Sequence, residues 1–281
     1  MSPPPLALRC GDKTLDLSRP VVMGVVNVTP DSFSDGGRFL ASDAAVAHGV
    51  RLAAEGAALI DVGGESTRPG AEPVALEEEL RRVVPVIERL RAATRAIISV
   101  DTSKPEVMRA ALAAGAGLVN DVYALRAPGA LQAVAGSGCG LCLMHMQGEP
   151  RTMQAAPRYT DVVAEVRAFL AERVDACRAA GVEPQRIAVD PGFGFGKTLE
   201  HNLTLLRQLH ALAAGGSPVV VGLSRKSMVG TLTGRPPGER LNGSVALAVV
   251  AALAGARIIR AHDVAATVEA LKVVAAVMGR E

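Results

Sequence analysis

Aromatic residues are scarce in this sequence, whose 281 residues include five Phe, two Tyr and no Trp. Proteins that bind single-stranded nucleic acid stack its bases on aromatic side chains, so the scarcity argues against that class. Hydrophobic residues still make up 49% of the chain and charged residues 21%, a globular composition that is too apolar for a disordered protein. We therefore expect a core packed from Ala, Val, Leu and Ile.

An excess of charge of one sign is also missing, because 30 Lys and Arg balance 28 Asp and Glu to a net charge of +2. Such a chain has no overall field that attracts nucleic acid or an anionic membrane. The longest apolar run, Val245 to Ala256, is about half a bilayer span. The first residues lack the charged and apolar regions of a secretory signal, and four cysteines are too few for a disulfide framework. These absences favour a cytoplasmic protein.

Short β-branched runs recur along the chain, each followed by a segment with helical spacing. The eight runs are residues 21–26, 59–62, 97–100, 118–119, 141–144, 187–189, 219–223 and 258–259. The helical segments are residues 44–55, 76–93, 105–114, 130–135, 161–180, 203–214, 244–253 and 264–278. Strands that alternate with helices predict a parallel sheet with right-handed crossovers. Eight such units favour an α/β fold of the (β/α)8 TIM-barrel type, with a doubly wound open sheet as the alternative.

No linker or shift in composition divides the chain, so we expect one domain over residues 1–281. Residues 6–17 precede the first strand of the barrel. We expect them to form a short N-terminal lead-in, or a hairpin, that covers the barrel floor.

Polar or ionisable residues follow each predicted strand, whereas the opposite strand ends carry mainly Gly, Ala, Arg and Pro. The set comprises Asn27, Asp61, Asp101, Asn120, Asp121, His145, Asp190, Ser224, Arg225, Lys226, Arg260 and His262. Active sites of barrels form at the carboxyl ends of the strands, so this distribution predicts a functional rim. Polar residues also simply mark where strands become loops, which accounts for some of the set. Three cations, Arg225, Lys226 and Arg260, are expected to converge at this rim.

Two long loops extend from the same rim. Residues 27–37 and 63–70 are rich in Thr, Ser, Asp and Arg, with glycines that expose backbone N–H groups. Loops of this composition suit an anionic ligand and a metal ion.

Other motifs do not support a function. Residues 192–198 look like a phosphate-binding P-loop, but that pattern requires glycine where Pro191 stands, and the dinucleotide fingerprint fails as well. Cys139 and Cys142 would point to opposite faces of a strand, so zinc or redox chemistry is not expected.

The histidines divide into two groups. His48 and His210 fall on predicted helices away from the rim, and we expect them to be surface or satisfied residues. His145 follows a strand, where it could either support the site or serve packing alone.

Several stretches resemble the signatures of dihydropteroate synthases. Residues 23–37 (MGVVNVTPDSFSDGG) resemble the first signature and residues 61–70 (DVGGESTRPG) resemble the second. The match continues in order through residues 99–105, 119–122, 143–148, 190–197, 224–227 and 259–263. It covers nearly the whole chain, about residues 6–278, and the family is a (β/α)8 barrel.

The resemblance implies a transferase of folate biosynthesis that binds Mg²⁺, forms a homodimer and is a target of sulfonamides. It would condense 6-hydroxymethyl-7,8-dihydropterin diphosphate with p-aminobenzoate to 7,8-dihydropteroate and pyrophosphate. The mechanism expected is dissociative: pyrophosphate leaves first, and the arylamine then attacks a pterin-methyl cation. Neither nucleic acid nor a membrane is implied as a partner.

The resemblance also implies roles for individual residues. The pterin would contact Asp101, Asn120, Asp190, Lys226, Met144 and Phe195. The diphosphate would be held by Asn27, Thr67, Arg68, Arg260 and His262, with Asn27 as the metal ligand. The p-aminobenzoate would lie among Phe33, Thr67, Pro69, Lys226 and Ser227. Catalysis would rest on Asp101, Lys226, Arg260 and His262.

Three alternatives stay open. A non-catalytic pterin-binding paralogue would have lost some rim residues, and none is lost here. A methyltetrahydrofolate-binding methyltransferase domain would not need the anion cluster at residues 224–227 and 260–262. An unrelated phosphate-sugar barrel would leave the two loop signatures unexplained. Because Phe33, Phe193 and Phe195 fall in two rim loops, we expect the few aromatic rings to lie where flat ligands bind.

Overall fold

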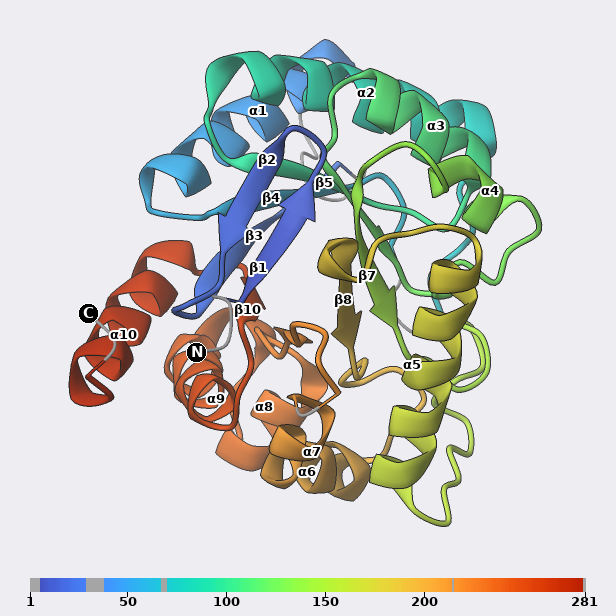
Figure 1. The fold of residues 1–281 in the computed structure, drawn as a ribbon. Helices are drawn as coiled ribbons and strands as arrows, with labels where there is room; N and C mark the ends of the chain where they lie inside the picture. The colour runs from blue at the N-terminus through green and yellow to red at the C-terminus, as the bar shows by residue number, and fades with distance from the viewer. Residues whose placement is uncertain (1–5, 29–37, 67–69, 214, 280–281) are drawn as a thin grey trace.

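The eight predicted strands form one parallel sheet. The computed structural model describes residues 6–28, 38–66, 70–213 and 215–279 (Figure 1). The strands are β3 (Val21–Asn27), β4 (Leu59–Gly63), β5 (Ile97–Asp101), β6 (Leu118–Asp121), β7 (Gly140–Met144), β8 (Ile187–Asp190), β9 (Val220–Gly222) and β10 (Ile258–Ala261). Their order in the sheet is β8-β7-β6-β5-β4-β3-β10-β9.

The two ends of this sheet meet between β8 and β9. Val189 pairs in parallel with Val219, and its N–H donates to the carbonyl of Pro218 at 2.9 Å. The sheet is therefore a closed ring, which confirms the TIM barrel and excludes the doubly wound alternative.

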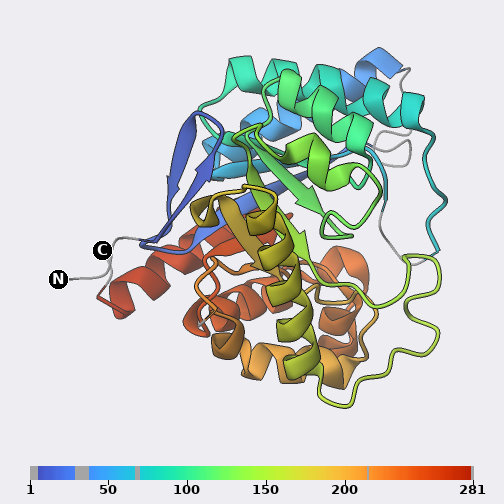
Figure 2. The ribbon, with the colours of Figure 1, turned by 45° about the vertical axis from the view of Figure 1, so that its right-hand side comes forward.

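Helices surround the ring on its outer side (Figures 1 and 2). They are α1 (Arg38–Ala54), α2 (Leu76–Ala93), α3 (Pro105–Ala113), α4 (Ala130–Val134), α5 (Val162–Ala179), α6 (Leu199–Arg207), α7 (Leu209–Ala213), α8 (Ser227–Thr233), α9 (Leu241–Leu253) and α10 (Val264–Val277). Two 3₁₀ turns, η2 (Pro184–Arg186) and η3 (Pro237–Glu239), lie between them. No helix in the described ranges is long and apolar enough to cross a membrane.

The helix expected over residues 203–214 differs from the prediction. It begins four residues earlier, at Leu199, because Thr198 and His201 form a capping box in which each side chain accepts the other residue's backbone N–H. It is also interrupted at Gln208, which separates α6 from α7, and residue 214 lies outside the described residues. The short helix α8 was not predicted.

An N-terminal hairpin closes one end of the barrel. Strands β1 (Ala7–Cys10) and β2 (Lys13–Asp16) are antiparallel, and in Figure 1 they lie across the near end of the ring. Leu8, Cys10 and Leu15 pack against the first residues of the barrel strands, such as Leu59 and Leu118. The predicted cover of the barrel floor is confirmed, so the opposite end carries the functional rim.

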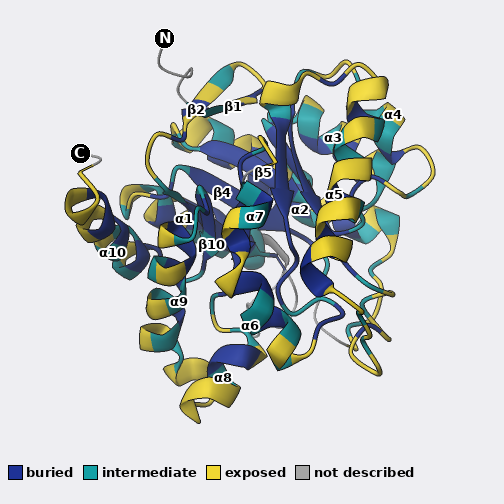
Figure 3. Cartoon of the chain, turned by 60° about the horizontal axis from the view of Figure 1, so that its bottom comes forward, coloured by how far each residue is buried: buried dark blue, intermediate teal, exposed yellow. Residues whose placement is uncertain are grey.

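Ala, Val, Leu and Ile dominate the layer between strands and helices, as expected from the composition. Figure 3 shows buried strands inside helices whose outer faces are exposed. The two cysteines of the CxxC motif belong to different layers, because Cys139 packs in this outer layer and Cys142 in the barrel interior. Both cysteines are buried, and neither forms a disulfide.

Candidate active site

A buried carboxylate lies at the centre of the rim. Asp61, in β4, is fully buried and accepts hydrogen bonds from Ser99 Oγ at 2.6 Å and from Asn120 Nδ2 at 3.1 Å. Its second oxygen also accepts the Nε–H of Arg260 at 2.7 Å. The sequence predicts Asp61 at the rim without a role there, and the structure shows that it holds Arg260.

Arg260 lies between two carboxylates. In addition to the bond to Asp61, its Nη2 donates to Asp101 Oδ2 at 2.9 Å. Burial lowers the pKa of Arg260, but the Asp61 and Asp101 carboxylates outweigh it and hold the pKa above its usual range. The guanidinium therefore stays charged and is fixed in position.

Two further acids at the rim have raised pKa values. Burial, with the neighbouring Asp61 carboxylate, raises the pKa of Asp101 to about 7, although Arg260 opposes the shift. Burial also raises the pKa of Asp190, and there Lys226 and a 2.7 Å hydrogen bond from the Gly192 N–H oppose it. Desolvated acids beside fixed cations are typical of functional sites.

Lys226 extends from the start of α8 towards these acids. Its Nζ donates to the carbonyl of Phe193 and lies 4.6 Å from the centre of the Phe195 ring. Burial lowers the pKa of Lys226 to about 8, and Asp190 acts in the opposite direction. Gly222 in β9 adjoins this arrangement, since a Cβ there would lie in ordinary van der Waals contact, at 3.8 Å, with both Lys226 Nζ and Arg260 Cβ.

An apolar patch adjoins the polar residues. Met144, at the end of β7, is 5% exposed and packs with Val122 and Met146, and the partly buried Phe195 joins them. This patch and the group of Asp101, Asn120, Asp190 and Lys226 occupy the same rim, so the structure brings together the residues expected to contact a pterin.

Two expectations about the rim are wrong. Arg225 does not converge with Lys226 and Arg260, because its side chain forms an ion pair with Asp263 and is 44% exposed. Phe193 does not face a ligand either. It is 0% exposed and belongs to the core between strands and helices, since its position in the loop directs the ring inward.

His145 supports a loop and does not face the rim. Its Nδ1 lies 2.9 Å from the Nζ of the buried Lys197, and its ring packs edge-on against Phe169. Lys197 also donates to the carbonyls of Gly192 and Phe195, at 3.0 Å each. Burial and Lys197 together lower the pKa of His145 to about 3, so the imidazole is neutral. The sequence left its role open, and it gave no role to Lys197.

A charged cluster anchors the start of the second rim loop. Glu79 of α2 is 1% exposed and accepts a hydrogen bond from Thr102 Oγ1 at 2.6 Å. The ammonium of Lys104 bridges Glu79 and Glu65. A pocket beside Asp101 is lined in part by Glu65 and Thr102. This cluster is not predictable from the sequence, because its members come from three separate segments.

The remaining predicted residues take these positions. Asn27 is the half-buried last residue of β3, and Ser227 is the exposed first residue of α8. His262 follows β10, and its Nδ1 lies 3.1 Å from Ser224 Oγ. Phe33, Thr67, Arg68 and Pro69 lie outside the described residues.

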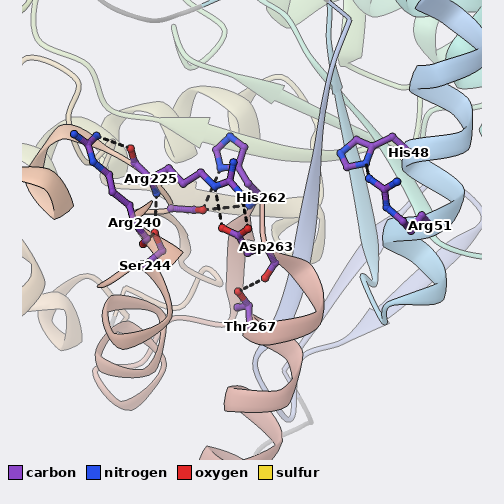
Figure 4. Close-up of polar contacts among 9 residues, drawn as sticks. His48, Arg51, Arg225, Arg240, Ser244, His262, Asp263 and Thr267 are labelled. Atoms are coloured by element: carbon purple, nitrogen blue, oxygen red, sulfur yellow. Dashed lines mark hydrogen bonds and ion pairs between the residues drawn. The ribbon is translucent and has the colours of Figure 1, made fainter. Parts of the chain in front are cut away.

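The two helical histidines behave as expected: His48 contacts Arg51 on α1, as Figure 4 shows, and His210 is exposed.

With this geometry established, comparison with known proteins identifies the class. The family described as "Pterin binding enzyme" matches residues 23–262. A dihydropteroate synthase of Escherichia coli is 54% identical over 265 residues, which cover 94% of each chain. The chain therefore belongs to the pterin-binding enzyme family, among the dihydropteroate synthases.

Solved structures agree with this assignment. A dihydropteroate synthase of Xanthomonas albilineans with 4-aminobenzoic acid is 58% identical, with a TM-score of 0.93 over 98% of each chain. A structure of the enzyme from the same organism in complex with 7,8-dihydropteroate is 56% identical, with a TM-score of 0.88 over 97% of this chain and 98% of that one.

Proposed function

We propose that the protein condenses 6-hydroxymethyl-7,8-dihydropterin diphosphate with p-aminobenzoate to give 7,8-dihydropteroate and pyrophosphate. One observation carries the proposal: a set of buried and partly buried acids and cations lies beside an apolar patch at the rim of a barrel whose relatives are dihydropteroate synthases. The flat, polar-edged pterin matches that combination. The neighbouring structures with 4-aminobenzoic acid and 7,8-dihydropteroate support both ends of the reaction.

In this proposal the pterin edge, with its alternating donors and acceptors, meets Asp101, Asn120, Asp190 and Lys226. Met144 and Phe195 cover the ring. The diphosphate contacts Arg260 and His262, together with Asn27, Thr67 and Arg68. The p-aminobenzoate lies among Phe33, Thr67, Pro69, Lys226 and Ser227.

The C–O bond to the diphosphate breaks first in the proposed mechanism, and a pterin-methyl cation forms. Asp101 offsets the positive charge that spreads into the ring, since a unit-charge pair at 4 Å and an effective dielectric of 20 is worth about 4 kcal/mol. Arg260 and His262 stabilise the departing pyrophosphate. A guanidinium has five N–H donors, and two of those of Arg260 are directed to Asp61 and Asp101, so its other donors meet the diphosphate.

The arylamine nitrogen of p-aminobenzoate then attacks the methylene carbon. An aniline nitrogen is already nucleophilic, so this step requires no strong general base. His145 does not act as a base in this step, because its ring is buried and its Nδ1 contacts the Nζ of Lys197. The proton released by the amine passes to solvent or to the pyrophosphate.

Mg²⁺ is proposed as the cofactor. The residues fit a metal that is shared with the substrate: the described residues contain no group of three or more His, Cys, Asp or Glu that could hold an ion by themselves. Asn27 offers a side-chain oxygen at the end of β3. Mg²⁺ commonly takes one or two protein ligands and completes its shell with phosphate oxygens and water. When bound, it would neutralise charge on the leaving diphosphate.

The activity is tested by incubating the purified protein with both substrates and Mg²⁺ and measuring 7,8-dihydropteroate and pyrophosphate. Product that depends on p-aminobenzoate, and that a sulfonamide suppresses by competition with p-aminobenzoate, is the expected result. Binding of the pterin without any product would instead indicate the non-catalytic paralogue. Methyl transfer from methyltetrahydrofolate would instead indicate a methyltransferase domain.

We also propose that the protein is a cytoplasmic homodimer. Each chain would form one domain over residues 1–281. Within the described part of the chain, the exposed large apolar residues concentrate on α8, α9 and α10; they are Leu232, Leu241, Val250, Leu253, Val273, Val277 and Met278, with Val50 alone elsewhere. Contiguous exposed apolar surface is typical of a protein interface. In analytical ultracentrifugation, we expect the wild type to sediment as a dimer and a Val250→Glu variant to sediment as a monomer.

A further inference from the structure

Arg225 has a backbone conformation that needs support. Its φ is +59°, and a residue with a side chain in this left-handed region is strained by about 1–3 kcal/mol. Such strain persists only where the surroundings fix the residue from several sides. Arg225 stands between Ser224 and Lys226, in the turn that leaves β9.

Three separate contacts fix Arg225, as Figure 4 shows. Its guanidinium binds the carboxylate of Asp263 with two nitrogens, one of them Nε at 2.9 Å. Its N–H donates to Ser244 Oγ of α9 at 2.9 Å, and its carbonyl accepts Arg240 Nη1 at 3.0 Å. Side chain, N–H and carbonyl are therefore each held by a different residue.

Arg240 reaches the turn by crossing α8. Its Nη1 also lies 3.3 Å from the carbonyl of Lys226, and its Nε donates to the carbonyl of Arg235 at 3.0 Å. Gly230 allows the crossing, because a Cβ there would lie 2.2 Å from Arg240 Nη2. The carbonyls of two consecutive residues, Arg225 and Lys226, are thus both bound by one guanidinium.

Two bridges join the ends of β9 and β10. The inner bridge is Ser224 Oγ, which accepts the His262 N–H at 3.2 Å and lies 3.1 Å from His262 Nδ1. The outer bridge is the ion pair between Arg225 and Asp263, which directly follow Ser224 and His262 in the chain. The inner pair lies beside Lys226 and Arg260, whereas the outer pair is 44% and 18% exposed.

We propose that Arg225, Asp263 and Arg240 are positioning residues that form an outer clamp. The clamp fixes the position of Lys226 relative to His262. Lys226 contacts the pterin and His262 contacts the diphosphate, so both halves of one substrate molecule are bound at the same time. The clamp acts through these two residues. The inference rests on the proposed function for the roles of Lys226 and His262.

The clamp has a distinctive consequence. Pyrophosphate alone, or 6-hydroxymethyl-7,8-dihydropterin alone, needs only one half of the site, whereas the joined diphosphate substrate needs both halves in register. Loosening the clamp therefore weakens use of the joined substrate and spares the separate fragments. A misplacement of about 1 Å can cost about 100-fold in rate.

The test compares Arg225→Gly, which adopts a positive φ freely but lacks the guanidinium, with Asp263→Asn and with the double variant. Each single variant is expected to lower kcat/KM for the pterin diphosphate tenfold or more. The affinities for inorganic pyrophosphate and for 6-hydroxymethyl-7,8-dihydropterin, measured by calorimetry, should stay within twofold of wild type. The double variant should be no worse than either single one, because both changes break the same contact.

Glu239→Gln is the matched control, since it removes an exposed ion pair with Arg235 on the same flank of the barrel and should leave all these values unchanged. Equal losses for the fragments and the joined substrate would show general disorder of the site and overturn the clamp, as would wild-type kcat/KM or additive effects in the double variant. Failure of the proposed function is distinguishable, because the wild type itself would then make no product.

Discussion

Arg260 and Asp61 lie 199 positions apart in the chain, yet the Nε of Arg260 donates to the Asp61 carboxylate at 2.7 Å. Asp61 is fully buried, and the Arg260 side chain is 22% exposed. A buried carboxylate of this kind is stable only with its donors in place, and Ser99 and Asn120 supply the other two. Asp61 therefore fixes the cation on which the proposed departure of pyrophosphate depends.

We expect Asp61→Asn to destabilise the protein, because it leaves the charge of Arg260 with one fewer partner. Breaking a buried ion pair from one side costs about 3–5 kcal/mol, which urea denaturation would detect as a lower midpoint. Asp43→Asn is the control, since its pair with Arg89 spans 2.7 Å at exposures of 61% and 47% and such pairs contribute less than about 1 kcal/mol. Equal midpoints for the two variants would contradict the central role of Asp61.

The pH dependence of kcat/KM should be bell-shaped. Asp101, with a pKa raised to about 7, must lose its proton to offset the pterin cation, so activity falls as pH drops through 7. Lys226, with a pKa lowered to about 8, must keep its proton, so activity falls as pH rises through 8. kcat/KM reports the groups of the free enzyme, to which these values apply.

Two variants assign the limbs of that profile. Lys226→Arg should move the alkaline limb upward, because a guanidinium does not titrate in this range. Asp101→Asn should remove the acid limb and lower the plateau. An alkaline limb that stays near pH 8 in Lys226→Arg would show that another group controls it.

The barrel was predictable because its signals are local. Each strand is a short apolar run and each helix follows with its own spacing, so α2 was predicted at Leu76–Ala93, the bounds that the structure shows. Most rim residues were predictable for the same reason, since the carboxyl ends of parallel strands meet at one end of the ring. The count of eight units favoured a closed barrel, and the pairing of Val189 with Val219 between β8 and β9 decided against the open sheet.

The pairings within the rim were not predictable. Arg225 and Lys226 are adjacent and both charged, and only the positive φ of Arg225 sends its side chain to Asp263 while Lys226 turns inward. Phe193 and Phe195 are likewise two positions apart in one loop, yet one is buried in the core and the other lies beside Lys226. Side-chain direction in irregular segments depends on backbone angles that residue types alone do not set.

Gly192 is expected to tolerate no side chain. Its φ is +68°, and a Cβ there would lie 1.9 Å from the carbonyl oxygen of His145. The left-handed angle alone costs about 1–2 kcal/mol, and the overlap with rigid backbone must add to it, so Gly192→Ala should lose at least about 3 kcal/mol in the free energy of unfolding.

Gly181 offers a matched comparison, because its φ is +88° and no atom lies within 4 Å of an added Cβ. Gly181→Ala should lose only the cost of the backbone angle, about 1–2 kcal/mol. Unfolding in urea, with both variants measured beside the wild type, separates the two contributions. A loss for Gly192→Ala no larger than for Gly181→Ala would mean that the loop does not press on the residue 145 backbone as described.

The order of bond breaking can be tested with oxygen isotopes. If pyrophosphate leaves before the arylamine attacks, a label in the oxygen that bridges the pterin methylene and the diphosphate should scramble into non-bridging positions when p-aminobenzoate is withheld. Asp101→Asn should slow the scrambling by about 10²–10³-fold, because one charge contact worth about 4 kcal/mol is lost. Arg260→Ala should slow it to a similar degree, since it removes a preorganised donor to the leaving group. Product formation with p-aminobenzoate but no scrambling without it would show instead that attack and departure are concerted, and the role of Asp101 would then be to orient the pterin.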